Sequence, residues 1–431
     1  MKIVHIIPGS GGTFYCQNCV RDLGVVQAMR RSGQDVVVVP MYLPLELNEP
    51  GLASESPLFY GAVRTYLTQT LPGFQALPGW LARLLDARPL LGLAARQAGS
   101  TSAPGLAELT LSMLAGQEGR QADELDRLVS WLKREARPDI VSLSNALLLG
   151  LAAPIKAATG AKVVCHLQDE DVWVEAMPAT IREEIWRLAT EKAKEVDHFI
   201  AVSRYYGEAM RQRLALPADR LSVIYPGTDF NGYPPARPES TLPAIGFLSR
   251  RSEALGLGIL VDSFILLKRQ GRIPGLQLHL AGGQTPADAP FLRRQRRKLQ
   301  EAGCLADVLV LDRFDRQSRA AFLARLSLLS VPAMRGEAFA TYAIEALGCG
   351  VPVVLPQAGA FPELVETTGG GLLYEPNTAP ALAAALEALL LDPRRLKELA
   401  LAGQACALRQ FSIENSAEAT LAAYRRLLPA L

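Results

Sequence analysis

Two glutamates eight residues apart, Glu337 and Glu345, are the side chains whose type and spacing point most directly to chemistry. They stand in "EAFATYAIEALGCGVPVV" (337–354), where a loop passes into a helix that we expect to begin near Ala340 and to end at the Gly-Cys-Gly turn. A helix start presents unpaired N–H groups and a positive dipole end, which favour a diphosphate. Glu345, about a turn further in, is placed to accept hydrogen bonds from sugar hydroxyls, as acidic residues do for ribose. The alternative is an ordinary helix with solvated acids.

A second candidate is the stretch "HIIPGSGGTFYCQNC" (5–19), which follows directly on an apolar strand. Gly11 and Gly12 lack side chains, so their backbone can approach a phosphate closely. The stretch fails as a G-x-G-x-x-G motif, because Phe14 occupies the place of the third glycine. A dinucleotide-binding interpretation is therefore poor.

Cys16 and Cys19 fall at the expected start of the first helix, where the dipole lowers the pKa of a thiol. They could form a redox pair or half of a zinc site. Only Cys165 and His166 could complete that zinc site, and neighbours on a strand point to opposite faces. We favour small packing residues or acceptor contacts over either alternative.

The bulk composition excludes several classes of protein. The 431 residues are too many for one ordinary core, and the net charge of +2 argues against nucleic acid as a partner. The one dense basic run, "RRQRRK" (293–298), is expected to form the solvated face of a helix, with anionic lipid as the alternative contact. Scattered cysteines, an N-terminal strand in place of a signal peptide, and the absence of a long apolar run predict a cytoplasmic protein.

Short β-branched runs alternate with helical stretches, which favours parallel sheets. The expected strands of a first series are 2–8, 35–40, 138–144, 161–167, 198–203 and 221–227. Those of a second series are 243–249, 275–283, 307–312, 326–332 and 351–356. Residues 231–240 gather proline, glycine and charge, as a linker does. The pattern predicts an α/β protein with two similar doubly wound halves.

Residues 43–130 depart from this alternation. They are rich in leucine, alanine, proline and glycine, and suggest an insertion of helices. Such helices usually pack on their own domain; the alternative is an amphipathic surface for a lipidic acceptor or a peripheral membrane contact. A closing helix is expected after Ser412, with Glu414 in its first turn.

Several segments resemble, in order, the retaining glycosyltransferases of the GT-B fold, the family 4 group. They are "RPDIVSLSNALLLGLAA", "AKVVCHLQDED", "VSRYYGEAMRQRLALPADRLSVIYPGTDF", the Glu-x7-Glu segment with "PVV", and the closing "RQFSIENSAEATLAAYRRLL". The resemblance implies two Rossmann-like domains facing across a cleft. The first domain (1–228 with helix 413–431) would hold the acceptor, and the second (241–412) would hold the donor. It also implies sugar transfer with retention and no metal requirement.

The resemblance assigns roles residue by residue. It implies that Glu345 binds ribose, that Glu337 lies beside the donor sugar, and that Arg250 neutralises the diphosphate. His166 would reach the donor sugar from the first domain, with a buried structural histidine as the alternative. Further donor contacts are expected from Gly11, Gly12, Phe339, Ala340, Thr341 and Arg251. Acceptor contacts are expected from Asp169 and Cys16.

The co-substrate implied is a nucleotide-diphosphate-sugar, a UDP-sugar or GDP-sugar, with no other cofactor. The acceptor, a glycan, lipid or small molecule, is not identified by any residue. The "DED" run (169–171) is interpreted as loop carboxylates near the acceptor rather than as a metal motif. Leu255 stands where the family usually has a lysine, and Ala338 and Ala340 replace glycines. A catalytically weakened sugar- or nucleotide-binding module acting through partners is therefore the second hypothesis.

Overall fold

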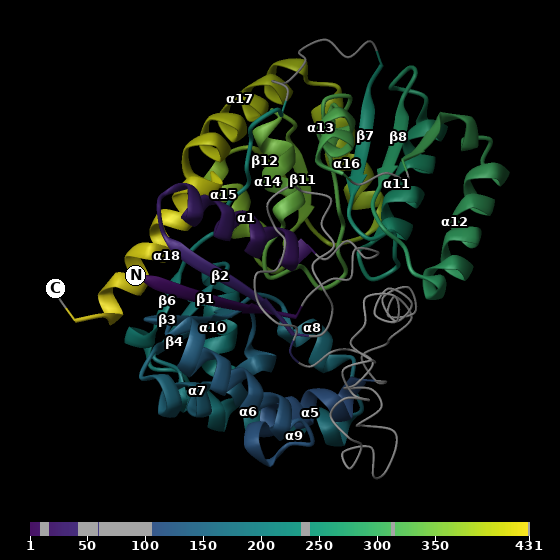
Figure 1. Cartoon of the computed structure of the whole chain (residues 1–431). Helices are drawn as coiled ribbons and strands as arrows, with labels where there is room; N and C mark the ends of the chain where they lie inside the picture. Colours follow the sequence, from purple (N-terminus) through teal and green to yellow (C-terminus); the bar gives the residue numbers. More distant parts are fainter. Residues whose placement is uncertain (9–16, 42–58, 60–105, 234–241, 312–314, 430–431) are drawn as a thin grey trace. The chain divides into compact units, whose positions relative to one another are not determined.

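The computed structural model describes residues 1–8, 17–41, 59, 106–233, 242–311 and 315–429 (Figure 1). The chain divides into two compact units. The first contains Met1–Tyr225 and Ser416–Leu431, and the second contains Pro226–Asn415.

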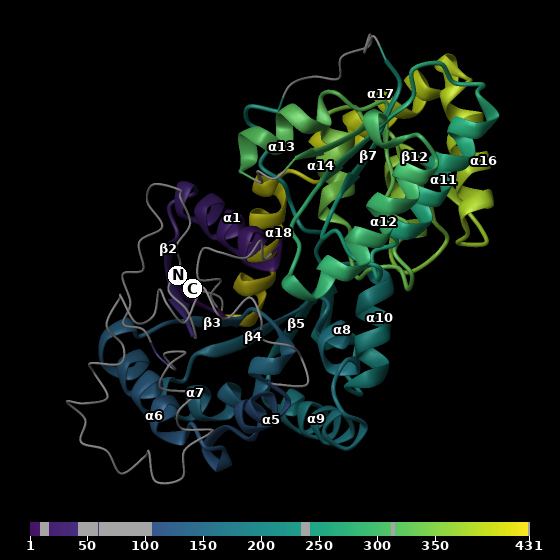
Figure 2. The same ribbon diagram turned by 90° about the vertical axis from the view of Figure 1, so that its right-hand side faces the viewer.

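The first unit is built on a parallel sheet of six strands in the order β2-β1-β3-β4-β5-β6. Its strands are β1 (Lys2–Ile7), β2 (Asp35–Pro40), β3 (Ile140–Leu143), β4 (Lys162–Leu167), β5 (His198–Ala201) and β6 (Leu221–Val223). Its helices are α1 (Gln17–Arg31), α5 (Ala107–Ala115), α6 (Ala122–Trp131), α7 (Ala152–Thr159), α8 (Glu170–Glu175), α9 (Ala179–Lys192) and α10 (Arg204–Arg213). The last helix of the chain, α18 (Ile413–Leu427), packs most of its length in this unit. Figures 1 and 2 show α5, α6, α7 and α9 on one face of the sheet and α1 and α18 on the other.

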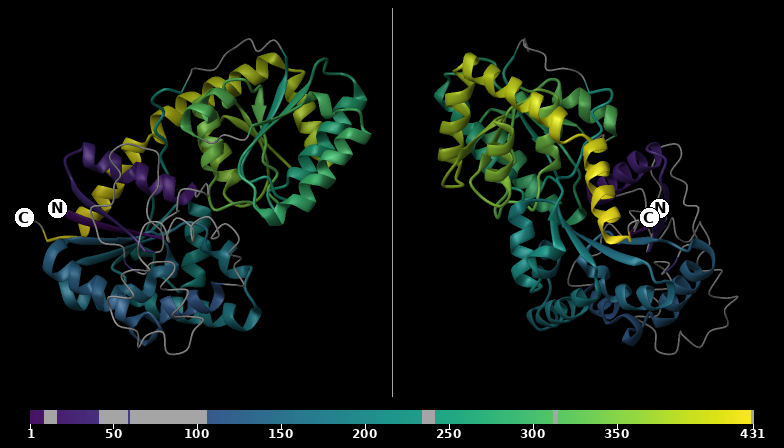
Figure 3. Two further views of the ribbon diagram at one scale, coloured as in Figure 1. Left: turned by 45° about the vertical axis from the view of Figure 1, so that its right-hand side comes forward. Right: turned by 90° about the vertical axis from the view of Figure 1, so that its left-hand side faces the viewer.

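The second unit has a parallel sheet of six strands in the order β12-β11-β10-β7-β8-β9. Its strands are β7 (Ala244–Leu248), β8 (Gln277–Ala281), β9 (Val308–Leu311), β10 (Leu328–Leu329), β11 (Val353–Pro356) and β12 (Gly371–Tyr374). Its helices are α11 (Leu257–Gln270), α12 (Ala289–Glu301), α13 (Arg316–Leu323), α14 (Thr341–Gly348), α15 (Phe361–Thr368), α16 (Ala379–Leu390) and α17 (Pro393–Gln410). Helices cover both faces of this sheet (Figure 3).

The central strands explain why these segments form sheets. Strands β3, β7 and β11 are buried along their whole length, because helices cover both faces and each run is almost entirely apolar. On α1, Leu23 and Val26 turn into the core of the first unit, each 2% exposed. The apolar spacing thus fixes which face of the helix is buried.

Most elements expected from the sequence are confirmed, often a residue or two shorter. The expected strand at 326–332 is reduced to the two residues of β10. Strand β12 was missed, because "GLLY" is short and follows two glycines that read as a loop. The basic residues of the run 293–298 are exposed on α12, as expected, whereas Gln295 between them is buried.

Much of the insertion expected over 43–130 lies outside the described residues. The described part, Phe59 and residues 106–130, includes α5 and most of α6. Phe59 is 2% exposed and its ring lies 5.7 Å from that of Trp131. Among the described residues, no helix is both long enough and apolar enough to cross a membrane.

Candidate functional site

The strand order of the second sheet marks a place for a ligand. The chain moves from β7 to β8 and β9 in one direction, and from β10 to β11 and β12 in the other. In open parallel sheets, ligands bind outside the carboxyl ends of the strands at such a reversal. Arg250 follows β7 and Glu337 follows β10, so both predicted residues flank the reversal point.

The loops after β7 and β10 pack directly on each other. The N–H of Met334 donates to the carbonyl of Ala254 at 3.0 Å. Gly256 has φ +75°, and a Cβ there would lie 1.8 Å from the carbonyl oxygen of Pro332. Only glycine allows this approach, and it brings the Arg250 segment beside the loop that leads to Glu337.

Two further glycines hold the backbone of Glu337. Gly336 and Gly359 both have positive φ, +71° and +60°, and a Cβ on either would clash with the other's loop. The carbonyl of Glu337 accepts from the N–H of Ala360 at 3.0 Å. Its half-buried side chain accepts from the Tyr342 hydroxyl, whose pKa is raised by burial and by the Glu337 charge. Tyr342 therefore stays protonated and acts as a donor.

Helix α14 begins at Thr341, one residue after the expected start, with Ala340 at its N-cap. Alanine cannot cap, so the side chain that usually satisfies the first N–H groups of a helix is missing here. Such an end is suited to an anion. Phe339, just before it, is half-buried and stacks on Phe411, with ring centroids 6.2 Å apart.

Glu345 is buried, with 4% of its surface exposed, so the alternative of a solvated acid is wrong. Its Oε2 accepts from Arg319 Nε at 3.0 Å and from the Tyr233 hydroxyl at 3.2 Å. Burial and the neighbouring Glu345 raise the pKa of Tyr233, so this hydroxyl keeps its proton. Arg319 is also buried, and the two charges form a nearly dry ion pair.

Arg250 is held by a carboxylate that the sequence analysis missed. Its Nε and one terminal nitrogen donate to Asp288 at 3.0 and 3.1 Å, and the same nitrogen donates to Thr285 Oγ1 at 2.9 Å. Burial opposes the ionisation of Asp288, but hydrogen bonds from Arg250 and Thr285 outweigh it and lower the pKa. These hydrogen bonds fix the orientation of the Arg250 side chain, which is 45% exposed.

The neighbours of Arg250 are less exposed. Arg251 is 9% exposed and its N–H donates to the carbonyl of Gly283 at 2.8 Å. Leu255 is half-buried where the family usually has a lysine.

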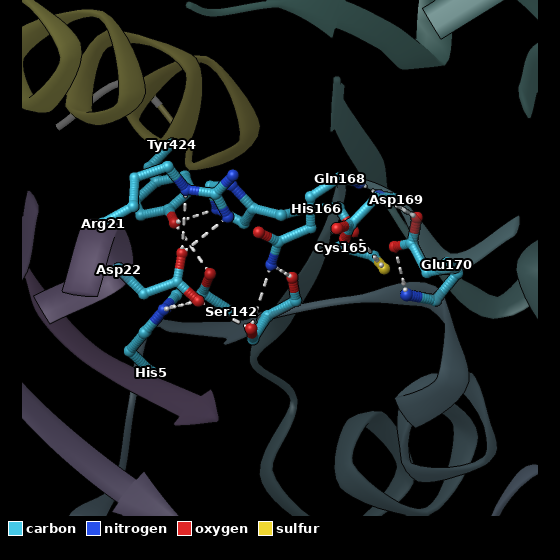
Figure 4. Close-up of polar contacts among 12 residues, drawn as sticks. His5, Arg21, Asp22, Ser142, Cys165, His166, Gln168, Asp169, Glu170 and Tyr424 are labelled. Atoms are coloured by element: carbon cyan, nitrogen blue, oxygen red, sulfur yellow. Dashed lines mark hydrogen bonds and ion pairs between the residues drawn. The ribbon is translucent and has the colours of Figure 1, made fainter. Parts of the chain in front are cut away.

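The first unit has the same kind of reversal, between β1 and β3. A largely buried polar cluster lies there, formed by His5 of β1, Asp22 of α1, Ser142 of β3, the half-buried His166 of β4 and Tyr424 of α18 (Figure 4). Tyr424 donates to Ser142 Oγ at 2.9 Å, and its oxygen lies 3.3 Å from His166 Nε2. Because the hydroxyl proton is used on Ser142, His166 donates from Nε2 and its Nδ1 is left as an acceptor.

Burial, with help from neighbouring groups, keeps His166 neutral. Burial and the edge-on His5 ring, 5.8 Å away, lower the pKa of His166 to about 3, although Asp22 opposes the shift. Burial opposes the ionisation of Asp22, but Arg21, at 2.8 Å, together with His5 and His166, outweighs it and lowers the pKa well below the usual range. Asp22 also accepts from Ser144 at 2.6 Å.

The "DED" run is not a set of loop carboxylates, and that interpretation is wrong for Glu170. This side chain is 3% exposed at the start of α8. It accepts from the N–H groups of Ala146 and Gln168, each at 2.9 Å, and from the Tyr206 hydroxyl at 2.8 Å. Glu170 therefore fastens the end of β4, while Asp169 is exposed.

Two family models match the chain. The model described as glycosyl transferases group 1 matches residues 235–405, and that described as glycosyltransferase family 4 matches residues 112–231. The chain belongs to the group 1 glycosyltransferases.

Curated relatives match about half of this glycosyltransferase. The D-inositol 3-phosphate glycosyltransferase of Mycobacterium marinum is 28% identical over 48% of the chain and 46% of the relative. That of Mycobacterium bovis (strain BCG / Pasteur 1173P2) is 30% identical over 48% of the chain and 44% of the relative. The matched segments thus span less than half the length of these relatives.

Solved structures agree on the fold. Anabaena Alr3699/HepE, crystallised with UDP, superposes with a TM-score of 0.68 at 20% identity, covering 99% of this chain and 100% of its own. Sucrose-phosphate synthase of Thermosynechococcus elongatus gives 0.67 at 19% identity, covering 99% of each. The fold is the Rossmann-like, two-domain GT-B fold predicted from the sequence; the cleft expected between the domains stays a prediction.

The second unit of the glycosyltransferase contains Glu337, Phe339, Ala340, Thr341, Glu345, Arg250 and Arg251. His166 and Asp169 belong to the first unit. Gly11, Gly12 and Cys16 lie outside the described residues, as does the side chain of Cys19. Within the described part of the chain, no group of three His, Cys, Asp or Glu side chains is arranged to hold a metal ion. Cys165 is buried, and burial raises the pKa of its thiol.

Sequence reasoning missed the partners of these residues. The sequence contains a pattern that points to Asp288, because Thr-Pro-Ala-Asp (285–288) has the spacing of a capping box and forms a capping box in the structure. A weaker pattern points to Asp22, because it lies four residues before the buried Val26 on the same face of α1. For Arg319, Tyr233 and Tyr424 we find no pattern that would have identified them.

Proposed function

We propose that this glycosyltransferase transfers a sugar from a nucleotide-diphosphate-sugar to an acceptor hydroxyl, with retention of the anomeric configuration. The observation that carries the proposal is the pair Glu337 and Glu345 on either side of the uncapped start of α14, at the reversal point of the second sheet. The solved structures of Alr3699/HepE with UDP and with UDP-glucose support a UDP-sugar as the first donor to test.

In this proposal the second unit binds the donor. The N–H groups at the start of α14 and the Arg250 guanidinium receive the diphosphate, Glu345 accepts from ribose, and Glu337 accepts from the donor sugar. Asp288 holds Arg250 in one orientation, so little side-chain entropy is lost on binding. His166 is neutral at physiological pH, and it would serve as a hydrogen-bonding group toward the sugar rather than as an acid.

The proposed reaction takes place on one face of the sugar. The bond from the anomeric carbon to the diphosphate oxygen breaks as a bond forms to the acceptor oxygen, and the acceptor proton passes to the departing phosphate. The products are the glycosylated acceptor and a nucleoside diphosphate, with no metal ion required. Arg250 and the helix N–H groups stabilise the negative charge that develops on the leaving group.

The first experiment is calorimetric titration of the protein with UDP, GDP and ADP. We expect one of them to bind and the binding to be lost in Glu345→Ala. Turnover with the matching nucleotide-sugar, followed by NMR of the anomeric proton, tests the stereochemistry. An inverted product would overturn retention, and failure of all three diphosphates to bind would overturn the donor site.

The second candidate, a module with weakened catalysis, rests on Leu255 in the place of the usual lysine. It predicts nucleotide binding without turnover, and a gain of turnover in Leu255→Lys. Measurable turnover that Glu337→Gln abolishes, in a variant with an unchanged circular dichroism spectrum, would exclude it.

A further inference from the structure

The contacts of Glu345 treat its two oxygens differently. Arg319, from α13, and Tyr233 both donate to Oε2, at 3.0 and 3.2 Å. Among the described residues, no hydrogen bond reaches Oε1. The carboxylate is therefore fixed through one oxygen while the other keeps its lone pairs.

The ion pair between Arg319 and Glu345 is buried. The side chains of Arg319 and Glu345 are 10% and 6% exposed, so the charge of Glu345 depends on Arg319 for compensation. An isolated buried carboxylate would take up a proton or rotate toward water, and either change would spoil a hydrogen-bond acceptor. Tyr233 is itself held by a cation–π contact, because the guanidinium of Arg316 lies 5.8 Å from the centroid of its ring.

We propose that Arg319 and Tyr233 are positioning residues that hold Glu345 Oε1 as the acceptor for the ribose hydroxyls of the donor nucleotide. The inference rests on the proposed function, which assigns Glu345 to ribose. It adds that discrimination between ribose and deoxyribose depends on two residues that do not themselves contact the sugar. Loss of either side chain should reduce the preference for ribose over deoxyribose more than it weakens binding of the diphosphate.

The test compares a nucleoside diphosphate with its 2′-deoxy and 3′-deoxy forms by calorimetry on the full-length protein, using whichever of UDP, GDP and ADP binds. We expect the wild type to prefer the ribose form over at least one deoxy form by about tenfold or more, the effect of one hydrogen bond to a charged group. In Arg319→Met the preference should fall below about threefold, mainly through weaker binding of the ribose form. Tyr233→Phe should reduce it in the same direction by a smaller factor.

Controls separate positioning from folding. Arg325→Met changes an exposed arginine just after the same helix, and it should leave the preference unchanged. Arg319→Lys should restore part of the preference, because it keeps the charge while losing the guanidinium geometry. If Arg319→Met does not fold, Tyr233→Phe, which removes only a hydroxyl, carries the test.

Each contrary outcome has a distinct meaning. A wild type that binds ribose and deoxyribose forms equally would overturn the inference while leaving the diphosphate site standing. The inference would also fail if Arg319→Met weakened all forms by the same factor, because Arg319 would then act on the diphosphate or only on the fold. An unchanged preference for the ribose form in a folded Tyr233→Phe would show that Tyr233 does not help to position Glu345. Binding of none of the three diphosphates would overturn the proposed function and this inference with it.

Discussion

At the scale of single residues, the side chains suited to chemistry are held by partners far away in the sequence. Glu345 depends on Arg319, Arg250 on Asp288, and His166 on Tyr424. The glutamate pair could be predicted because its spacing and the helix start both lie within the short segment 337–354. The partners could not, because they come from other elements and only the fold brings them near.

The contact between Tyr424 and His166 gives the first prediction. Tyr424→Phe removes the hydroxyl that bridges His166 Nε2 and the buried Ser142, leaving two polar groups short of a partner. We expect a loss of about 1–2 kcal/mol in the free energy of unfolding. Nitrogen NMR should also show the Nε2–H tautomer of His166 giving way to a mixture. Tyr205→Phe, which alters a tyrosine that is 47% exposed, serves as the control for the tautomer and should leave it unchanged.

The pKa of His166 gives the second prediction. Its native value of about 3 lies below the ordinary 6.5, so the unfolded chain binds the proton first as the pH falls. His166 therefore costs stability progressively between about pH 6.5 and pH 3, by up to about 1.4 kcal/mol per pH unit. The melting temperature should drop more between pH 7.5 and 5.5 in the wild type than in His166→Gln. Equal drops in the two proteins would contradict a neutral His166.

At the scale of elements, the sequence predicted segments with a strong local pattern and missed those without one. Strand β1 is an unbroken apolar run and α14 combines a loop signal with a closing glycine turn, so both were found. Strand β12 is stabilised by pairing with β11, which no local pattern reports. From the sequence alone, Glu170 is interpreted as a loop carboxylate because two of its partners, Ala146 and Tyr206, lie more than twenty residues away.

The two glycines that cap α11 give the third prediction. Gly256 and Gly271 both have positive φ, +75° and +67°, but only at Gly256 would a Cβ meet another loop, at Pro332. Gly271→Ala should cost about 1 kcal/mol, the strain of the left-handed backbone alone. Gly256→Ala should cost about 2–4 kcal/mol, because the loop after β10 must also move.

Nucleotide affinity separates these two variants. Gly256 lies on the loop after β7 that also carries Arg250, the residue proposed to receive the diphosphate. Strain in this loop should therefore weaken binding of the nucleoside diphosphate in Gly256→Ala, while Gly271→Ala should not. Unfolding by urea measures the first effect and calorimetric titration the second. Equal affinities in the two variants would show that the packing of Gly256 on Pro332 does not shape the donor site.

At the scale of the whole molecule, the same plan is used twice. Each unit has a six-stranded parallel sheet with one reversal point, and polar residues gather beside that point in both. The chain passes between the units at Tyr225–Pro226 and at Asn415–Ser416. Beside these crossings, Thr228 pairs with Ser412, and the N–H of Thr228 donates to Phe411 at 2.8 Å. The alternation of strands and helices predicted this plan, but not which residues form hydrogen bonds with each other beside the two crossings.

This division predicts separable unfolding, which differential scanning calorimetry can resolve. Arg250, Glu345 and the start of α14, which are proposed to bind the nucleoside diphosphate, lie in Pro226–Asn415, so a bound nucleoside diphosphate is expected to stabilise that unit. At a free concentration of about 100 times Kd it should add about 2.7 kcal/mol and raise one transition. Tyr424→Phe acts in the other unit and should lower the other transition. When the nucleoside diphosphate is added to Tyr424→Phe, the two effects should add, because the changed groups share no contacts. A single transition that responds to both changes would show that the two units unfold as one cooperative body.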